Sequence, residues 1–371
     1  MKIPLSRPEI RRADSAAVNA VLRGPRLSLG KKLEEFERAV ASYAGAKHAV
    51  AMNSGTSALH VALAALGVGP GDEVIVPSFA FIAVANAVCH AQATPVFVEI
   101  EPDTLTLDPV AVERAIARKT RAIVVVHTFG CPADMGKLLT IARRHRIALI
   151  EDACEAIGAE FRGEKVGSLG RAGIFAFYPN KQMTTGEGGV LITNDDKLTA
   201  RARRLRNQGR GASRDWLDQE EIGFSYRLPE LNCALGISQL KRLDSVIRRR
   251  EKIAKEYARG LAGNSDIELP RLKFPDRRIS WFTYTVRLSP RFTRADRDAI
   301  VKQMAERGIE CGRYFAPIHL QPSYRRIGRR SGDLSLTEAT AERTISLPFF
   351  NRMTGREVGT VSRTLARLLQ G

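Results

Sequence analysis

The sequence contains few cysteines and no long apolar run. Only five of its 371 residues are cysteine, and no two of them have the C-x-x-C spacing of a zinc or redox motif. A disulfide scaffold and a zinc ribbon are therefore disfavoured, and a reducing compartment is favoured. No stretch reaches 18 consecutive apolar residues, so we expect no transmembrane helix. The first residues, MKIPLSRPEIRRAD, lack the apolar core of a secretory signal, and we expect a cytoplasmic protein.

Acidic residues are few beside the basic ones. The chain has 40 Asp and Glu but 58 Lys and Arg, which gives a net charge of +18. Residues 1–200 carry +2 of this charge, and residues 201–371 carry +16. Such a surplus would suit nucleic acid, a membrane surface or a phosphorylated substrate. Because 44 of the 58 cations are Arg, and no aromatic residues interleave with the basic runs, we instead expect mostly solvated helix faces, with neither nucleic acid nor membrane as a partner.

Short apolar runs alternate with helical patterns from residue 48 onward. Near-continuously apolar strands separated by helices are typical of a parallel sheet covered on both faces. We therefore predict an α/β fold whose large domain has a mostly parallel seven-stranded sheet flanked by helices. The expected strands are His48–Met52, Glu73–Val76, Thr94–Val98, Ala122–His127, Ile147–Ile150, Gly173–Tyr178 and Gly189–Thr193. The expected helices are Lys31–Tyr43, Ala58–Leu66, Ala80–His90, Pro109–Arg118 and Met135–Arg144.

The last third of the chain has a different pattern. Helical spacing runs over Lys197–Arg206. A second and longer helical stretch runs over Leu231–Gly260, where we expect a single helix. Two strands are then expected at Ile267–Pro270 and Trp281–Leu288, followed by helices at Ala295–Arg307 and Glu357–Leu369. We predict a large domain over residues 1–249, ending in a crossover helix, and a smaller α+β domain over residues 250–371.

Polar or aromatic residues stand shortly after four of the expected strands. The segment Asn53–Ser57 opens a helix, and its amides and hydroxyls either bind an anion or only cap the helix. Phe81 offers an aromatic face after the second strand. Asp152 follows the fifth strand, where it either caps a turn or faces a ligand, and Lys181 follows the sixth, ahead of a glycine-rich loop. In open parallel sheets these strand ends meet where ligands bind.

This set of groups matches a pocket for pyridoxal phosphate (PLP). The phosphate needs helix-end amides and hydroxyls, the ring nitrogen needs a carboxylate that keeps it protonated, and the aldehyde needs a lysine for a Schiff base. A lysine displaced by an incoming amine can then carry a proton between carbon atoms. We therefore predict PLP as the cofactor and no metal.

Five segments also resemble, in their amino-acid sequence and in their order along the chain, the DegT/StrS family of sugar aminotransferases, which are fold-type I PLP enzymes. The resemblance covers about residues 5 to 350. It implies a homodimer with active sites shared between subunits, an amino-acid donor such as glutamate, a nucleotide-diphosphate keto-sugar of the 4-keto-6-deoxy or 3-keto type as acceptor, and ping-pong kinetics. The segments are NSGTSALHVALAALGVGPGDEVIVPSFAF, HTFGCPADM, EDACEAIGAEFRGEKVGSLG, FAFYPNKQMTTGEGG and RYFAPIHLQPSY.

The resemblance implies a role for single residues. Lys181 would form the Schiff base and shuttle the proton, and Asp152 would pair with the pyridine nitrogen. A lysine here also argues for transamination, because the dehydratases of the family carry histidine instead. The residues implied to hold the rest of the cofactor are Gly55, Thr56 and Ser57 at the phosphate and Phe81 on the ring.

Three positions depart from the commonest family pattern. Ala176 stands where relatives often carry a phosphate-binding serine, and Glu155 stands where they often carry glutamine near the phenolic oxygen. Ser225 stands where an asparagine often reaches the partner subunit's phosphate. Because serine can donate one hydrogen bond, we keep Ser225 as a cofactor-binding candidate.

The sequence indicates the substrate-binding residues less specifically than the cofactor-binding residues. Arg313, Tyr314 and His319 lie in a segment that borders the sugar site in relatives, and Arg227 is a candidate for the subunit interface or for the donor carboxylate. Packing in the small domain explains Tyr314 and His319 equally well, and a plain salt bridge explains Arg227. Two other functions stay open: an aminotransferase acting on an inosose in an aminocyclitol pathway, and a non-catalytic regulatory relative or nucleic-acid binder.

Overall fold

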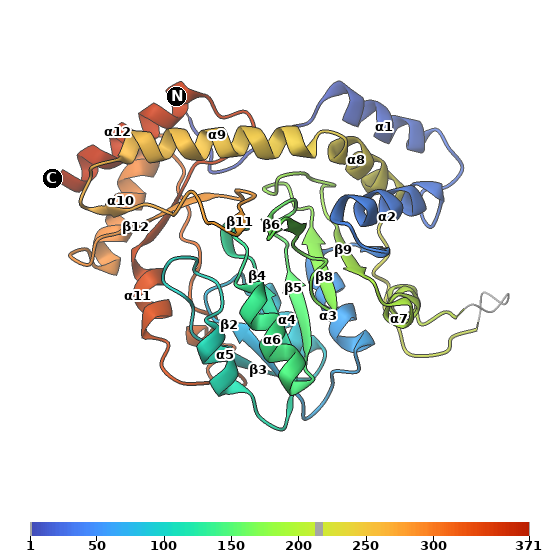
Figure 1. Cartoon of the computed structure of the whole chain (residues 1–371). Helices are drawn as coiled ribbons and strands as arrows, with labels where there is room; N and C mark the ends of the chain where they lie inside the picture. Colours follow the sequence, from blue (N-terminus) through green and yellow to red (C-terminus); the bar gives the residue numbers. More distant parts are fainter. Residues whose placement is uncertain (1, 212–217, 371) are drawn as a thin grey trace.

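An eight-stranded sheet runs through the larger part of the molecule in the computed structural model, which describes residues 2–211 and 218–370 (Figure 1). The strand order is β1-β9-β8-β5-β4-β2-β3-β13. All neighbours are parallel except that β9 runs antiparallel to both β1 and β8. The strands are β1 (His48–Met52), β2 (Glu73–Pro77), β3 (Thr94–Val98), β4 (Thr120–Val126), β5 (Ala148–Asp152), β8 (Ala172–Ala176), β9 (Gly189–Thr193) and β13 (Arg329–Arg330).

The seven predicted strands are all present, and the mostly parallel sheet is confirmed. The eighth strand, β13, comes from the C-terminal third and pairs with β3. It consists of two exposed arginines, so no apolar run in the sequence predicts this strand.

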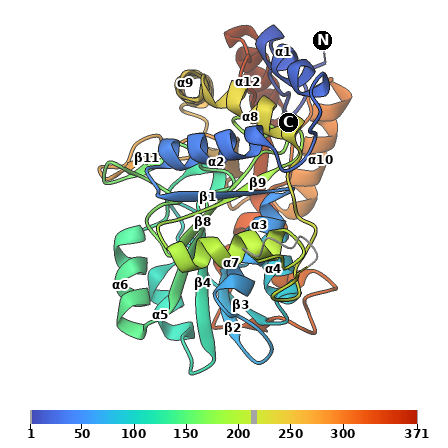
Figure 2. The same ribbon diagram turned by 90° about the vertical axis from the view of Figure 1, so that its right-hand side faces the viewer.

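Helices cover both faces of this sheet, because successive strand residues point to opposite sides. Ala49 and Ala51 of β1 belong to the core on one face, and Val50 and Met52 belong to the core on the other. In Figure 2, α5 and α6 lie on the opposite side of the strands from α3 and α4. The first face carries α2 (Lys31–Ala44), α5 (Pro109–Ala115) and α6 (Met135–His145). The second carries α3 (Gly55–Ala65), α4 (Ala83–His90) and α7 (Asp196–Arg206).

A smaller antiparallel sheet, with the order β10-β12-β14, forms the C-terminal part. Its strands are β10 (Ile267–Glu268), β12 (Tyr284–Leu288) and β14 (Thr344–Leu347), and its helices are α10 (Arg294–Glu306), α11 (Ser335–Arg343) and α12 (Gly355–Gln370). The long helix predicted over residues 231–260 is two helices, α8 (Glu230–Leu240) and α9 (Leu243–Leu261), because the chain turns at Lys241 and Arg242.

The two parts of the molecule interleave. Helix α9 crosses the top of Figure 1 and contains residue 250, so a boundary at 249/250 would fall inside a helix. Ile3 of the N-terminal segment belongs to the core of the C-terminal part, where its amide donates to the Gly308 carbonyl at 2.8 Å. The division into domains at this position stays a prediction.

The remaining elements are small. They are α1 (Arg12–Leu22), two short 3-10 helices (Thr128–Gly130 and Ile318–Leu320) and a three-stranded sheet with the order β11-β6-β7. The strands of this sheet are β6 (Glu160–Phe161), β7 (Glu164–Lys165) and β11 (Arg277–Arg278). Among the helices of the described residues, none combines the length and the hydropathy that a membrane crossing requires.

Candidate active site

Lys181 lies in the loop after β8 and is largely buried. Its amide donates to the Tyr178 carbonyl at 3.0 Å, which closes a turn, and its side chain is 13% exposed. The Nζ atom stands 3.7 Å from Glu155 Oε1 and 4.1 Å from the ring centre of Phe282. A carboxylate and an aromatic face therefore surround the ammonium group.

Two neighbouring carboxylates at the end of β5 have different roles. Glu151 is fully buried and accepts hydrogen bonds from the amides of Gly167, Leu169 and Gly170 at 2.7–2.8 Å, which fixes the chain before β8. Asp152 points the other way, as alternation along a strand requires. Its Oδ1 accepts from the amide of Cys154 at 3.1 Å. Asp152 therefore lies at the last position of β5, on the opposite face of the sheet from Glu151.

Glu155 follows in the same loop and is 6% exposed. Its Oε2 accepts from the Phe129 amide at 2.8 Å. Burial raises the pKa of this carboxyl, and the negative charge of Asp152 adds to that effect, while Lys181 and the Phe129 amide oppose it.

The N-terminus of α3 meets the same edge of the sheet. Ser54 caps the helix, accepting from the Ser57 amide at 3.0 Å, and the Ser57 hydroxyl donates to Asn53 Oδ1 at 2.6 Å. A Cβ atom on Gly55 would lie 2.8 Å from Ala176 Cβ and 3.0 Å from Cys154 Sγ. Glycine at residue 55 therefore lets the first amides of the helix approach the ends of β5 and β8.

The C-terminal part covers Lys181 through a short segment before β12. The amides of Ser280 and Phe282 donate to the carbonyls of Gly130 and Phe129 at 3.0 and 3.1 Å. Gly130 has φ +90°, and a Cβ there would lie 1.9 Å from the Ser280 carbonyl oxygen, so this contact requires glycine. Next to Phe282 lies the ring of Tyr314, nearly parallel, with the ring centres 6.4 Å apart.

With this geometry, comparisons with known proteins identify the family. A model described as the DegT/DnrJ/EryC1/StrS aminotransferase family matches residues 8–366. The chain belongs to this family. The resemblance stated from the five sequence segments is thereby confirmed.

Two curated relatives of the family are similar over most of their length. The GDP-perosamine synthase of Caulobacter vibrioides is 42% identical over 345 residues, which are 92% of this chain and 91% of the relative. The dTDP-3-amino-3,4,6-trideoxy-alpha-D-glucose transaminase of Streptomyces venezuelae is 42% identical over 342 residues, 92% and 88% of the two chains.

Solved structures of family members confirm the fold and the cofactor. DesV of S. venezuelae, solved in complex with a ketimine intermediate, has a TM-score of 0.93 and 39% identity, covering 100% of this chain and 99% of DesV. The putative sugar aminotransferase Spr1654 of Streptococcus pneumoniae, in its PLP form, has a TM-score of 0.95 and 28% identity, covering 100% and 99%. The protein is thus a PLP-dependent aminotransferase of the DegT/DnrJ/EryC1/StrS family.

The residues present fit PLP. The close approach at Gly55 brings the start of α3 against Ala176 and Cys154, two residues after Asp152, and Lys181 pairs with Glu155 in the same loop as Cys154. A helix N-terminus, a carboxylate and a buried lysine are the groups that the phosphate, the ring nitrogen and the aldehyde require. Phe81, which would lie on the ring, has 64% of its surface exposed.

The structure does not bring every sequence candidate to Lys181. Ser225 is exposed and pairs with Asn207, to which Arg227 also donates at 3.2 Å. Within the described part of the chain, neither residue forms a hydrogen bond or ion pair with Lys181 or Asp152. Their roles stay predictions.

Arg313 and His319 have protein partners of their own. Arg313 is exposed, pairs with Asp298 at 3.1 Å, and lines a cavity of about 490 Å³ with three other arginines, Arg294, Arg297 and Arg325. His319 is buried, and its two ring nitrogens contact Ser78 Oγ at 2.6 Å and Glu338 Oε1 at 2.9 Å. Burial lowers the pKa of His319 despite the opposing carboxylate. These contacts favour the packing interpretation for His319.

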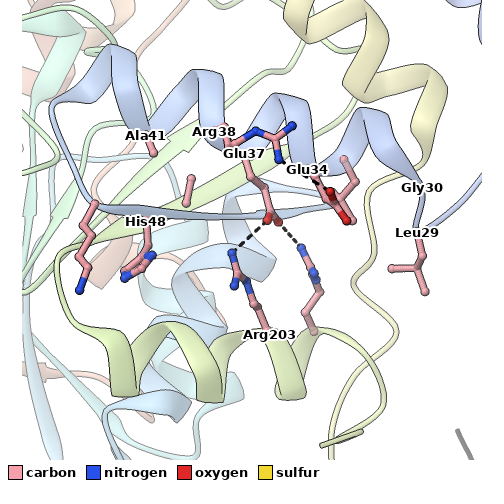
Figure 3. Close-up of a pocket in the computed structure, with 12 residues that line it drawn as sticks. Leu29, Gly30, Glu34, Glu37, Arg38, Ala41, His48 and Arg203 are labelled. Carbon is pink, nitrogen blue, oxygen red and sulfur yellow. Dashed lines mark hydrogen bonds and ion pairs between the residues drawn. The ribbon is translucent and has the colours of Figure 1, made fainter. Parts of the chain in front are cut away.

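A separate cavity of about 510 Å³ lies between α2, β1 and α7, lined by residues that include Leu29, Gly30, Arg38 and His48 (Figure 3). Glu37 points into it and pairs with Arg203 and Arg206 at 3.5 and 2.5 Å. Glu37 also accepts from the Ala51 amide, and Arg206 donates to the Ala51 carbonyl, at 2.9 and 3.0 Å. The pair binds the backbone of Ala51 and so protects this part of the outer edge of β1 from pairing with another strand.

Sequence reasoning missed Phe282, which it placed inside a predicted strand. The predicted strand covers Trp281–Leu288, but the strand in the structure, β12, begins only at Tyr284. The amide of Phe282 instead donates to the Phe129 carbonyl, and no local sequence pattern predicts that contact.

Replacing Gly55 with alanine should weaken cofactor binding, although alanine is the better helix former. The added methyl group would press on Ala176 and Cys154 and displace the start of α3. We expect the Kd of PLP to rise about tenfold and the free energy of unfolding to fall by about 1–3 kcal/mol. Absorbance titration and thermal unfolding measure both.

Gly69 provides the control, because a Cβ there has no atom within 4 Å and φ is not positive. Gly69→Ala should leave both quantities near their wild-type values. Wild-type PLP affinity in Gly55→Ala would contradict the assignment of this helix end to the phosphate.

Proposed function

We propose that the protein transfers an amino group from glutamate to a nucleotide-diphosphate keto-sugar of the 4-keto-6-deoxy or 3-keto type, in the biosynthesis of a cell-surface polysaccharide or a secondary metabolite. The observation that carries the proposal is the burial of Lys181 between Glu155 and Phe282, at the sheet edge that holds Asp152. The nucleotide-sugar activities in the names of the two relatives at 42% identity support the acceptor class. We expect the reaction to take place in the cytoplasm.

Bound PLP supplies an electron sink that stabilises negative charge on the carbon next to the reacting nitrogen. In this proposal, residues of the chain hold the cofactor and move the proton. Asp152 would hold the proton on the ring nitrogen, and the amides of α3 with Thr56 and Ser57 would hold the phosphate. Lys181 would move a proton between two carbons of the substrate through its Nζ atom. Phe282 keeps water away from that atom.

We assign the substrate to the side of the site that the C-terminal part forms. The ring of Tyr314 lies nearly parallel to that of Phe282, which in turn contacts Lys181, and this favours Tyr314 as a substrate residue. Arg313 precedes it and offers a guanidinium group that suits a diphosphate. Arg227 remains the candidate for the donor carboxylate, and His319 a weaker candidate for the sugar.

We further propose a homodimer in which Ser225 and Arg227 serve the partner subunit's site. Arg227 bridges Met52 at the outer edge of β1, and Ser225 lies two residues before it. Arg227 shares a cavity with Leu29 and Ile222, whose large apolar side chains are exposed in the single chain, Ile222 to 93%. An exposed apolar group of this kind is typical of an interface. Light scattering should give about twice the chain mass of 40.9 kDa. A mass of one chain would contradict the shared site.

The two half-reactions test the function directly. Glutamate should bleach the absorbance band of the protein-bound cofactor, and a nucleotide-linked keto-sugar should restore it. Lys181→Ala should lose the band and the turnover, because no amine remains at this position to bind the aldehyde. Lys197→Ala is the matched control, since Lys197 is exposed on α7.

A panel of acceptors distinguishes the alternatives. Restoration by an inosose but by no nucleotide keto-sugar would overturn the acceptor class. A purified protein that shows no such band, or a band that survives in Lys181→Ala, would overturn the assignment of Lys181.

Arg313→Ala should raise the KM for the nucleotide sugar about tenfold with little change in kcat, because a hydrogen bond to a charged phosphate contributes about 1.5–3 kcal/mol. Arg356→Ala, at an exposed position on α12, is the control. If Arg313→Ala is no worse than Arg356→Ala across a range of salt concentrations, the arginine does not face the substrate.

A further inference from the structure

Helix α9 has an arginine in the middle of its apolar stripe. Leu243 and Ile247 of this helix pack in the core on one face of the large sheet. Ile253 and Tyr257 pack in the core of the C-terminal part. Arg250 stands between these two pairs at helical spacing and is buried, where an apolar residue would continue the stripe. The arginine therefore lies where the two parts of the molecule meet.

The guanidinium group of Arg250 is buried without a counter-charge. In the described part of the chain, its hydrogen bonds go only to uncharged oxygen atoms. They are the carbonyls of Trp281 and Phe282, both at 2.6 Å, and Asn351 Oδ1 at 2.5 Å. Because a buried charge without an opposite charge costs stability, packing alone does not explain an arginine here. A rigid fork of donors that holds three acceptors at once does explain it.

Two of these acceptors belong to the segment that covers Lys181. The ring centre of Phe282 is 4.1 Å from Lys181 Nζ. The Phe282 amide donates to the Phe129 carbonyl at 3.1 Å, and the Phe282 carbonyl accepts from Arg250. The backbone of Phe282 is thus held on both sides of its side chain. The guanidinium group thereby limits how far the ring can move from Lys181.

The third acceptor connects Arg250 to the chain beside Lys181. Asn351 is buried, accepts from Arg250 through Oδ1, and donates through Nδ2 to the Gln182 carbonyl at 3.3 Å. Gln182 directly follows Lys181, and its buried side chain donates to the Ser280 carbonyl at 2.8 Å. One buried network therefore holds both the backbone after Lys181 and the aromatic ring that its Nζ atom contacts.

We propose that Arg250 is a positioning residue for the aminotransferase reaction, which holds the ring of Phe282 and, through Asn351, the backbone beside Lys181 in a fixed relation. The inference rests on the role proposed for Lys181. A displacement of about 1 Å between reacting groups can slow a reaction about a hundredfold. Looser placement of the lysine should therefore lower kcat. Among the described residues, Arg250 bonds to none of the proposed substrate residues, so KM should change little.

The substitution Arg250→Met removes the donors and keeps an unbranched apolar chain in the stripe. We expect kcat, counted per bound cofactor, to fall between about tenfold and about a hundredfold. The KM values for the amino donor and for the sugar should stay within about twofold of wild type, because the substrate contacts are unchanged. Counting per bound cofactor removes the effect of a smaller folded fraction from the steady-state rates.

A second readout uses cofactor-free protein and no turnover. Hydrogen exchange over residues 279–283, followed by mass spectrometry, reports on the amides of Ser280 and Phe282, which donate to carbonyls of the part that contains the large sheet. This exchange should be about tenfold faster in Arg250→Met, because the segment has lost its hydrogen bonds to a charged donor. In the holoenzyme, the circular dichroism of the cofactor band should decrease, because the cofactor lysine is held less rigidly.

Arg242→Met is the matched control. Arg242 stands about two helical turns before Arg250, and it binds the carboxylate of Asp14 at 2.7 Å and the carbonyl of Glu9 at 2.8 Å. Its loss should lower the thermal stability but leave kcat and the exchange over residues 279–283 near their wild-type values. Arg250→Lys is the second variant, since lysine keeps the charge but not the fork, and it should also lower kcat.

Wild-type kcat per bound cofactor in Arg250→Met or in Arg250→Lys would overturn the proposal, and so would an equal fall of kcat in Arg242→Met. Unchanged exchange over residues 279–283 would overturn it as well. If Arg250→Met does not fold, as judged by circular dichroism, Arg250→Lys takes its place in both measurements. Failure of the proposed function would appear separately, as an absorbance band that persists in Lys181→Ala.

Discussion

An ammonium group that leaves water needs a counter-charge and closely packed walls, and the site around Lys181 depends on this requirement. The large sheet provides the charge, through Glu155 in the loop after β5. The C-terminal part provides a wall, through Phe282. Neither part completes the surroundings of the lysine alone, so the site exists only where the two are docked.

Buried polar groups hold the C-terminal part against the part that contains the large sheet. Arg250 of α9 is 2% exposed and donates to the carbonyls of Trp281 and Phe282 at 2.6 Å and to Asn351 Oδ1 at 2.5 Å. Burial lowers the pKa of this guanidinium to about 9. Gln182, the residue after Lys181, donates to the carbonyls of Glu155 and Ser280 at 2.6 and 2.8 Å. The segment that carries Phe282 is thus held by both parts of the molecule.

Part of the basic surplus has a structural use. Sequence reasoning assigned most of the +16 in residues 201–371 to solvated helix faces. Four arginines of that region instead have buried or nearly buried side chains that bind carboxylates or backbone carbonyls: Arg206, Arg242, Arg250 and Arg297. Guanidinium groups suit this role because they offer five donors in a fixed plane.

The large sheet and the group at its edge were predictable because their signals are local. The ranges predicted from apolar runs for β1, β3 and β9 have the same first and last residues as the strands in the structure. Asp152 and Lys181 each stand at or shortly after the end of such a run, and a parallel sheet aligns these strand ends. The sequence marks Glu155 only through its departure from the family pattern. Phe282 was missed because it reaches the lysine through a contact about 100 residues away in the chain. Strand β14 and helix α11 were missed as well, in a short and mixed stretch of sequence.

Chemical mapping of the cofactor lysine tests the central claim most directly. Borohydride reduction of the PLP-loaded enzyme makes the bond between cofactor and lysine permanent, and peptide mass spectrometry then locates it among the 14 lysines. The account predicts a pyridoxyl group on Lys181 and on no other lysine in proportion to bound PLP. Modification of a different lysine, or none in an enzyme that binds PLP and turns over, would contradict it.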